Sequence, residues 1–549
     1  MMAAGSFMEK IYEGVLDQTA FHSFRMPSES ETLQTLMQAY RNLLKNYPVQ
    51  KIEEEGRIPE EMLREMGKAG FFGISVSRTY GGLGVTLLEY IRFVEEIAAA
   101  DMSCALVFLA HLFIGIKGIE LFGTEEQKQR YLPPAASGEM IFSYALTEPE
   151  TGSDARHIET TAELSEDGTH YVLNGMKTYI TNANYARGLT VFAQMDPKQP
   201  GYMGAFIVET EWEGVKIGKD MPKMGLKASS TASIRFQNVR VPVENRIGKP
   251  GEGFKIAMAV LNYGRLALGA ASTGLMEQSL KDMQHRARSR VQFGVPIQNF
   301  QLIQEKMINA RVHGFVTAAM NYFTAGLLES GEQEDPVIET SHCKLFGSTR
   351  AWDVLYDALQ LAGGSGYLSI QPYEKRVRDF RVVTIFEGTT EIHSIYPALY
   401  LLGRLGKRLR AHHGLSRWTF IARALFSSFA KMPWSVEDSD KISKEAVRLA
   451  KSNARRVKRM LLLGLLFYGE KVGEREYFLR RVTTLSLYLF GILAVLAKMT
   501  ADRRAGILND GERRLLGYFL EEAEEARRES AMIFSTKKEK LGAAIFREL

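Results

Sequence analysis

The period of the hydrophobic pattern changes along this 549-residue chain, from helical to alternating and back to helical. Residues 30–140 carry apolar side chains at helical spacing, broken by glycine-rich turns such as "GKAGFFG". From about residue 141 the pattern alternates with a period of two, which predicts short strands. Four long helical segments then follow, over residues 253–288, 296–330, 335–362 and 390–404. This order excludes a doubly wound nucleotide-binding fold, because strands and helices do not alternate.

Two dipeptides in the alternating region predict tight turns. Asp167-Gly168 and Asn174-Gly175 each stand beside alternating residues, and such dipeptides favour two-residue hairpins. The stretches "GAFIVET" and "ASIRFQNVRVP" add two more short strands. We therefore expect a mainly helical protein with a β-domain in the middle. Its expected domains are 1–140 (helical), 141–252 (β), 253–405 (a four-helix bundle) and 406–549 (additional helices).

Composition restricts the class of protein. The net charge of +5 is small for this length and does not indicate a nucleic-acid binder. The two cysteines, Cys104 and Cys343, give neither a disulfide framework nor a metal-ligand spacing, so no metal site is predicted. We find no signal-peptide pattern in residues 1–14 and no stretch of about 18 uncharged apolar residues. We expect a cytoplasmic protein of the bacterial type, peripheral to the inner membrane at most, or a mitochondrial one in a eukaryote.

The region after residue 405 is basic and then apolar, as in "GRLGKRLRAHH" and "KSNARRVKRMLLLGLLFYG". A basic amphipathic segment of this kind can lie in a membrane interface. The alternative is a helix packed on the bundle with a solvated basic face, and we favour this second interpretation.

A single carboxylate, Glu387, stands in "RVVTIFEGTTEIH" between an apolar run and Gly388. It is either an ordinary exposed loop carboxylate or a reactive group, and its own segment does not decide between the two. The glycine after it leaves space for a ligand to approach the backbone.

Six motifs together resemble the acyl-CoA dehydrogenase family. They occur in the family's order over roughly residues 60–405, and the extension to residue 549 resembles the very-long-chain subgroup, which has a C-terminal helical domain. The motifs are "YALTEPETGSDA" (144–155), "KTYITNA" (177–183), "MGLKASSTASIRFQNVRVP" (224–242), "RVQFGVPIQNFQLIQEKM" (290–307), "LQLAGGSGY" (359–367) and "IFEGTTEI" (385–392).

The resemblance implies a helical N-terminal domain, a middle β-domain and a C-terminal four-helix bundle. It also implies the cofactor FAD and the α,β-dehydrogenation of long-chain fatty acyl-CoA thioesters in fatty acid β-oxidation. That reaction needs a desolvated base within hydrogen-bond reach of the α-proton. By resemblance Glu387 is this catalytic base, which favours the reactive interpretation. The position that serves as base in some relatives is Gly264 here, which cannot act.

The resemblance also assigns residues to the cofactor. The ring of Tyr179 replaces a tryptophan that is frequent in the family, and stacking survives that change. Residues that reach the FAD of a neighbouring subunit require an oligomer, with a homodimer as the minimum. The implied FAD residues are Tyr144, Leu146, Thr147, Gly152, Ser153, Tyr179, Thr181, Arg290, Gln292, Phe293, Gln301, Gln360, Gly363, Gly364, Thr389 and Glu391.

The expected substrate contacts are Ser153, Arg265, Gly388, Gly115 and Gly118. Arg265 resembles an arginine that contacts the CoA part of the ligand, although a salt bridge on a helix is nearly as good an explanation. Each glycine of the apolar helix costs about 1 kcal/mol against alanine, so something there needs the space. In the very-long-chain subgroup these glycines match the bottom of the acyl tunnel. Close helix packing is the alternative.

Three functions are compatible with these motifs. The first is a long-chain acyl-CoA dehydrogenase that passes electrons to an electron-transfer flavoprotein. The second is a flavin oxidase of the same fold, such as an acyl-CoA oxidase, which passes electrons to oxygen. The third is a non-catalytic scaffold or assembly protein derived from this fold, against which the intact Glu387 and flavin motifs count.

Overall fold

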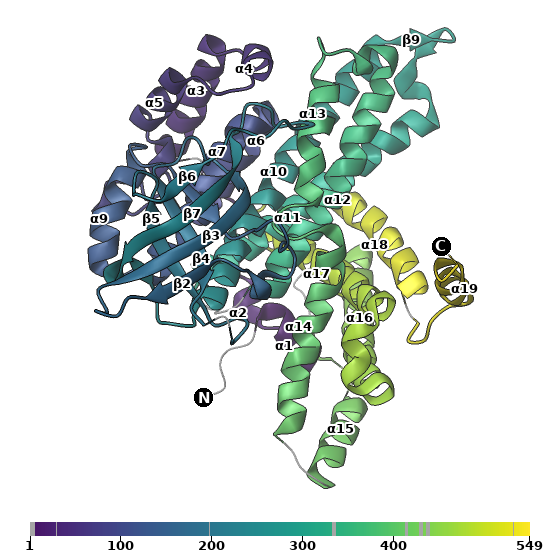
Figure 1. Ribbon diagram of the computed structural model, residues 1–549. Helices are drawn as coiled ribbons and strands as arrows, with labels where there is room; N and C mark the ends of the chain where they lie inside the picture. Colours follow the sequence, from purple (N-terminus) through teal and green to yellow (C-terminus); the bar gives the residue numbers. More distant parts are fainter. Residues whose placement is uncertain are drawn as a thin grey trace. The chain divides into compact units, whose positions relative to one another are not determined.

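The computed structural model describes residues 6–28, 30–196, 198–331, 336–411, 415–427, 432–434, 440–530 and 532–548. Residues 1–5 of the N-terminal segment and 412–414 of the basic segment lie outside this description. The chain forms two compact units. The sheet unit comprises Pro27–Met307 and Ala351–Gly388, and the helical unit comprises Met1–Met26, Ile308–Arg350 and Thr389–Leu549. Figure 1 shows the elements and labels most of the helices and strands.

The N-terminal half of the sheet unit is helical, as the sequence predicts. Thr86 and Glu89 form a capping box at the start of α6, which fixes where that helix begins. The apolar run after it is one buried stretch in which a π-helix, η3 (Leu109–Gly115), separates two short α-helices. The helices are α3 (Glu31–Asn46), α4 (Val49–Glu55), α5 (Glu60–Lys68), α6 (Leu87–Ala100), α7 (Met102–Phe108), α8 (Lys117–Phe122) and α9 (Glu125–Ala136).

The β-domain is a mixed sheet of eight strands in the order β6-β7-β3-β2-β4-β5-β8, with β1 parallel to β4. Figure 1 labels the strands β2 to β7 of this sheet. Its core includes Leu173, Val191, Phe206 and Ile234, all fully buried. The strands are β1 (Phe142–Ala145), β2 (Thr161–Leu164), β3 (His170–Thr181), β4 (Gly188–Gln194), β5 (Met203–Glu209), β6 (Val215–Ile217), β7 (Thr231–Pro242) and β8 (Arg246–Ile247).

One of the two predicted hairpins is confirmed and the other is wrong. Strands β2 and β3 pair antiparallel around the Asp167-Gly168 turn. Asn174-Gly175 instead lies inside β3, at a shift of register with β7. Gly175 has φ +147° there, and the Asn174 side chain accepts a hydrogen bond from the Asn238 N–H. The dipeptide forms a bulge rather than a turn because both flanking segments already have a partner strand.

His111 ties the π-helix to the first strand. Its Nδ1 accepts the Phe142 N–H at 2.9 Å, so its Nε2 carries the proton toward the carbonyls of Phe72 and Ala135, both at 3.2 Å. Burial lowers the pKa of His111 to about 4, which keeps the ring neutral at physiological pH.

Two of the four predicted helices after the β-domain, α10 and α14, begin where the sequence predicts, while the predicted start at 335 lies outside the described residues. Helix α10 runs over Gly253–Ser289 and packs on α6. The predicted segment 296–330 starts later, at Gln301, because residues 291–296 form the hairpin β9 (Val291–Gln292) and β10 (Val295–Pro296). The other helices are α11 (Gln301–Glu329), α12 (Val337–Ala362), α13 (Pro372–Phe380) and α14 (Thr390–Arg410). The predicted fold class is thereby confirmed.

The helical unit is organised around α17 (Glu476–Arg504), which contacts α14, α16 and α18. In α16 the residues Ala454, Val457 and Leu461 are buried while the basic residues between them stay partly exposed, as expected for a packed helix with a basic face. The remaining helices are α1 (Phe7–Glu13), α2 (Gln18–Phe21), α15 (Leu415–Ser427), α16 (Lys441–Tyr468), α18 (Asp510–Ser530) and α19 (Lys537–Phe546).

Two helical stretches bear on the expectation about membrane spans. Two helical stretches, Met102–Phe122 and Glu476–Arg504, are long and apolar enough to cross a membrane, with mean hydropathy 1.9 and 1.8. Their apolar windows are 89% and 83% buried inside the protein, as in core helices of soluble proteins, so they are weak evidence for a span. Membrane contact through the basic region stays a prediction.

Candidate active site

Glu387 lies in a strained turn of the sheet unit. The chain leaves α13, makes a 3₁₀ turn over Arg381–Thr384, and reaches Glu387 with φ +56°. Gly388 follows with φ +98°, a conformation that glycine adopts freely. For a residue with a side chain the left-handed region costs about 1–2 kcal/mol. Strain of this kind persists only where surrounding structure imposes it, and it concentrates at functional sites.

Gly264, in the N-terminal third of α10, faces the Glu387 carboxylate. A Cβ added at Gly264 would lie 2.9 Å from Glu387 Oε2 and 3.0 Å from Ile114 Cγ2. Both distances are too short for ordinary contacts, so any side chain at position 264 would require the Glu387 carboxylate or Ile114 to move. From the sequence, Gly264 is only a position that cannot act as a base. The structure adds a steric role, because the absence of a side chain at Gly264 lets the Glu387 carboxylate approach α10.

Tyr144 is close enough to both Glu387 and Arg265 to interact with each of them electrostatically. Tyr144, on β1, donates a hydrogen bond from its hydroxyl to the carbonyl of Ala257 at 3.3 Å. Burial raises the pKa of Tyr144 well above its usual value; the charge of Glu387 raises it further and that of Arg265 opposes the rise. Arg265 is 4% exposed and donates to Asn262 Oδ1 at 3.1 Å. A carboxylate, a phenol and a guanidinium therefore converge on one region of α10.

The loop after β1 is held by a buried ion pair that sequence analysis missed. Lys177 Nζ, fully buried in β3, lies 2.6 Å from Glu148 Oε1 and donates to the Leu146 carbonyl at 3.0 Å. Burial lowers the pKa of Lys177 to about 8, against the opposing effect of Glu148. The Glu148 carboxylate also accepts N–H groups of Glu159 and Thr160. The one sequence feature that could have indicated this ion pair is a lysine on the inward face of a predicted strand, since a buried lysine needs a charged partner.

The predicted flavin residues of this region frame an open surface. Thr178 donates its N–H to the Thr147 carbonyl at 2.9 Å, which joins the loop to β3. Tyr179 is 66% exposed with φ +57°, so its ring is held outward by a strained backbone. Leu146 is buried, Thr147 and Thr181 are half-buried, and Gly152 and Ser153 are exposed. No atom lies within 4 Å of a Cβ built on Gly152. The exposed ring of Tyr179 and the open space beside the Gly152 backbone fit a flat heteroaromatic cofactor.

A second group of predicted residues lies on the hairpin β9–β10 and on the turn after α12. Phe293 sits at the hairpin tip with φ +50° and is 93% exposed. Arg290, Gln292 and Gln301 are also exposed. Gln360, Gly363 and Gly364 are exposed near the end of α12, where Gly363 has φ +64°. A large aromatic residue so exposed is typical of an interaction surface, as a neighbouring subunit would provide.

The last predicted cofactor residues begin α14 and belong to the helical unit. Thr389 is the N-cap, and its hydroxyl accepts the Ile392 N–H at 3.3 Å. Glu391 lies exposed in the first helical turn.

The two predicted tunnel glycines differ in their surroundings. A Cβ on Gly115 would lie 2.9 Å from Phe142 Cβ, so Gly115 permits close packing on β1. A Cβ on Gly118 would make ordinary contacts of 3.7 Å with Ile256, Thr190 and Val260. A long side chain at 118 would therefore extend among these residues, whereas position 115 tolerates no side chain. The role of both in a tunnel stays a prediction.

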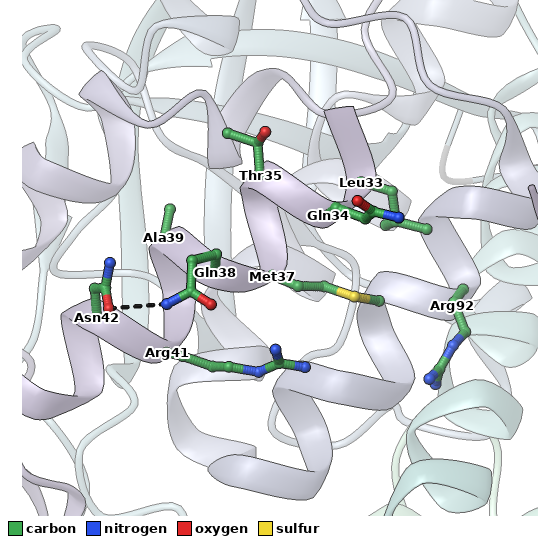
Figure 2. Close-up of a pocket in the computed structure, with 9 residues that line it drawn as sticks. All are labelled: Leu33, Gln34, Thr35, Met37, Gln38, Ala39, Arg41, Asn42 and Arg92. Carbon is green, nitrogen blue, oxygen red and sulfur yellow. Dashed lines mark hydrogen bonds between the residues drawn. The ribbon is translucent and has the colours of Figure 1, made fainter. Parts of the chain in front are cut away.

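A groove of about 780 Å³ on α3 and α6 lies apart from these residues. Figure 2 shows its lining, with the hydrogen bond from Gln38 to Asn42 and the side chains of Arg41 and Arg92. It includes none of the predicted site residues. Over the described ranges, no group of three or more His, Cys, Asp or Glu could hold a metal ion.

The structure combines mainly helical segments with one mixed sheet and places a loop carboxylate against a helix glycine. These features define a class of protein, and comparison with protein families identifies that class. The models of the acyl-CoA dehydrogenase N-terminal, middle and C-terminal domains match residues 30–139, 143–239 and 251–396. The chain belongs to the acyl-CoA dehydrogenase family.

Individual relatives refine this assignment. The chain is 38% identical over 390 residues to the mitochondrial very long-chain specific acyl-CoA dehydrogenase of Bos taurus, covering 65% of this chain but only 59% of that one. It is also 38% identical to an acyl-CoA dehydrogenase of Bacillus subtilis, over 64% of this chain and 92% of the relative. The crystal structure of a Bacillus anthracis acyl-CoA dehydrogenase complexed with FAD superposes with TM-score 0.83 and 28% identity, over 100% of this chain and 95% of that one.

Proposed function

We propose that the protein is an FAD-dependent dehydrogenase that converts long-chain fatty acyl-CoA to trans-2-enoyl-CoA. The observation that carries the proposal is the placement of the Glu387 carboxylate. It is held by a strained backbone against Gly264 and is coupled electrostatically to Tyr144. The family to which the chain belongs supports the reaction class.

Glu387 would take the α-proton of the thioester onto its carboxylate. An exposed carboxylate in water is far too weak a base for this proton, so a bound acyl chain must exclude water from it. Glu387 is half-buried in the protein alone, and a ligand lying over the turn would complete its burial. The strained backbone then acts as pre-organisation, because the carboxylate need not reorient on binding.

Bound FAD would supply the acceptor for the β-hydride, which is the chemistry that protein side chains cannot provide. We propose that Tyr144, Leu146, Thr147, Gly152, Ser153, Tyr179 and Thr181 hold the ring and its nearby phosphates. The Lys177–Glu148 pair would keep their loop in place. Arg290, Gln292, Phe293, Gln301, Gln360, Gly363, Gly364, Thr389 and Glu391 would hold the rest of the cofactor, in part across a homodimer.

Ser153, Arg265 and Gly388 would contact the substrate's CoA and thioester groups, Arg265 through its charge. Gly118 would set the depth of the acyl tunnel. The matched variants are Gly118→Ala, whose methyl group fits, and Gly118→Gln, whose side chain extends among Ile256, Thr190 and Val260. We expect Gly118→Gln to lower the kcat/KM for palmitoyl-CoA relative to octanoyl-CoA by about 10-fold or more. An unchanged ratio would show that the tunnel is elsewhere.

The central experiment is anaerobic reduction of the FAD-loaded protein by palmitoyl-CoA, followed by absorbance. Wild type should bleach, and Glu387→Gln should lose at least about 10³-fold in rate while keeping its FAD. Glu139→Gln removes an exposed turn carboxylate of the same unit and should bleach as wild type does. Bleaching by Glu387→Gln at the wild-type rate would disprove the role of Glu387. A wild type that binds no FAD would instead support a non-catalytic scaffold.

We propose an electron-transfer flavoprotein as the electron acceptor. An oxidase is the second candidate, because a prolyl acyl carrier protein oxidase is among the solved structures that resemble this chain, at TM-score 0.64 and 28% identity. Admitting oxygen to the reduced protein separates the two. Peroxide formed at the rate of turnover would support the oxidase, and slow reoxidation would support the dehydrogenase.

A further inference from the structure

Helix α13, which leads into the Glu387 turn, is held near its end by three charged side chains, two of which are buried. Lys375 Nζ lies 2.6 Å from Asp101 Oδ2 and 2.5 Å from Asp379 Oδ2. The side chains of Asp101 and Asp379 are 1% and 3% exposed, and that of Lys375 is 15% exposed. Glu53 approaches the same amine at 3.8 Å. We call Asp101, Lys375 and Asp379 the α13 clasp.

The loop 224–229 of the β-domain closes on the same end of α13. Leu226 donates its N–H to Asp379 Oδ1 at 2.6 Å, and it does so from φ +51°. A Cβ on Gly225 would lie 2.3 Å from the carbonyl carbon of Arg378, so the two backbones are in direct contact. Arg378 in turn donates to the Met224 carbonyl at 3.1 Å. The motif "MGLKASS" has no assigned part in the flavin site. Its residues 224–226 instead contact α13, the helix that precedes Glu387.

The segment between the clasp and Glu387 is short and rigid. Phe380 and Val383 are fully buried. The N–H groups of Ile385 and Phe386 both bond to the Val382 carbonyl, at 2.8 and 3.0 Å. Glu387 comes only eight residues after Asp379 (387 − 379). A displacement of Asp379 must therefore move Glu387, since this compact turn cannot absorb it.

We propose that the α13 clasp and its bond to Leu226 are a positioning device that sets the place of the Glu387 carboxylate against Gly264. This inference rests on the proposed function. Asp101, Lys375 and Asp379 do not act on the substrate themselves. They act by fixing the base, and an error of about 1 Å in such a group can cost about 10²-fold in rate.

The alternative is that the clasp only stabilises the fold, and the chain offers a matched control. In the helical unit, Lys498 also bridges two carboxylates, Asp502 and Glu512, and its side chain is 14% exposed. Removing either lysine leaves buried carboxylates without their cation, which destabilises both units in the same way. Only Lys375 is followed by the turn that carries Glu387.

The experiment compares Lys375→Met, Asp379→Asn and Lys498→Met in the FAD-loaded full chain. Asp379→Asn keeps the acceptor oxygen for Leu226 and guards against misfolding of the methionine variant. We expect Lys375→Met and Asp379→Asn to lower kcat by about 10- to 100-fold, with KM within about threefold. The isotope effect of α-deuterated palmitoyl-CoA on kcat should rise, because proton removal becomes slower. Lys498→Met should keep kcat within about twofold while its Tm falls.

Amide hydrogen exchange decides the question without activity. In Lys375→Met, exchange at Ile385 and Phe386 should be faster than in wild type, while in Lys498→Met it should be unchanged. If Lys375→Met and Lys498→Met agree in kcat, isotope effect and exchange at these two amides, the clasp is only structural and the proposal is wrong. A wild type without dehydrogenase activity would contradict the proposed function instead, and exchange would still test the clasp.

Discussion

The two compact units differ in where their backbone is strained. Among the residues that the structure describes, six other than glycine have positive φ, and all six lie in the sheet unit: Tyr179, Asn182, Leu226, Asn238, Phe293 and Glu387. The helical unit shows no such residue within its described part. Three of the six are predicted site residues, and Leu226 contacts α13. Backbone strain is therefore found in the unit whose side chains must be held in particular directions. The helical unit follows the regular geometry of packed helices.

Both units nevertheless contain the same kinds of buried groups. Each has a lysine that bridges two carboxylates, Lys375 or Lys498. Each also has a buried neutral histidine, His111 or His342. Burial and ion pairing alone therefore do not distinguish a unit that carries the chemistry from one that supports it. Perturbing matched groups in the two units separates stability from activity.

Phe490→Ala in the helical unit should have the largest effect on stability. Phe490 is fully buried in α17, with ring centroids 6.1 Å from Phe323 and His342. We expect the free energy of unfolding to fall by about 3–5 kcal/mol because a cavity remains. The kcat of the folded, FAD-loaded fraction should stay within twofold. A large fall of kcat in that fraction would remove the contrast between the units.

Gly264→Ala in the sheet unit should show the opposite pattern. The added methyl group displaces Glu387 or Ile114, since its carbon would lie 2.9 and 3.0 Å from them. We expect kcat to fall by about 10²-fold, equivalent to about 2.7 kcal/mol, with FAD retained. Steady-state kinetics and flavin absorbance of the same sample measure both. A variant with full kcat would mean that the carboxylate can act from more than one place.

Acid should destabilise both units by the same mechanism. Burial lowers the pKa of His111 to about 4 and that of His342 to about 3, below the ordinary value of about 6.5. As pH falls below 6.5 the unfolded chain takes up protons that the folded chain does not, so the free energy of unfolding falls. Each histidine should contribute a loss of about 2 kcal/mol between pH 7 and pH 5.

Denaturant titrations of His111→Gln and His342→Gln at pH 7 and pH 5 test this. Each variant should be less stable at pH 7 but should show a weaker pH dependence than wild type. His111→Gln should be the more affected at pH 7, because His111 contacts three backbone groups and His342 bonds to Ser486. An unchanged pH dependence would mean that the replaced histidine takes up its proton over the same pH range in the folded and unfolded states.

Arg41→Met should have the smallest effect. Arg41 pairs with Glu96 at 2.5 Å, but its side chain is 54% exposed, so water and salt screen the pair. Loss of unfolding free energy should be less than about 1 kcal/mol, and kcat should not change. Because Arg41 also lines the groove on α3, a change of kcat would assign that groove a function.

The sequence predicted regular structure better than tertiary pairing. The start of α10 at Gly253 and the hairpin at Asp167-Gly168 follow from local pattern. The hairpin predicted at Asn174-Gly175 was wrong because the same dipeptide occurs in bulges and in hairpin turns. Only the pairing with neighbouring strands decides which of the two forms. Lys375 and Asp101 are 274 residues apart, so no local spacing could pair them. The candidate base followed from family resemblance, whereas its strain and its contact with Gly264 required coordinates.

We propose that Glu387 removes the α-proton of a thioester, and hydrogen exchange at the α-carbon measures that step alone. The FAD-loaded protein is incubated in D₂O with an acyl-CoA whose β-carbon is replaced by sulfur, so that desaturation is blocked. NMR then follows the α-hydrogens. We expect rapid exchange with wild type and exchange at the uncatalysed rate with Glu387→Gln. Exchange by Glu387→Gln at the wild-type rate would contradict it.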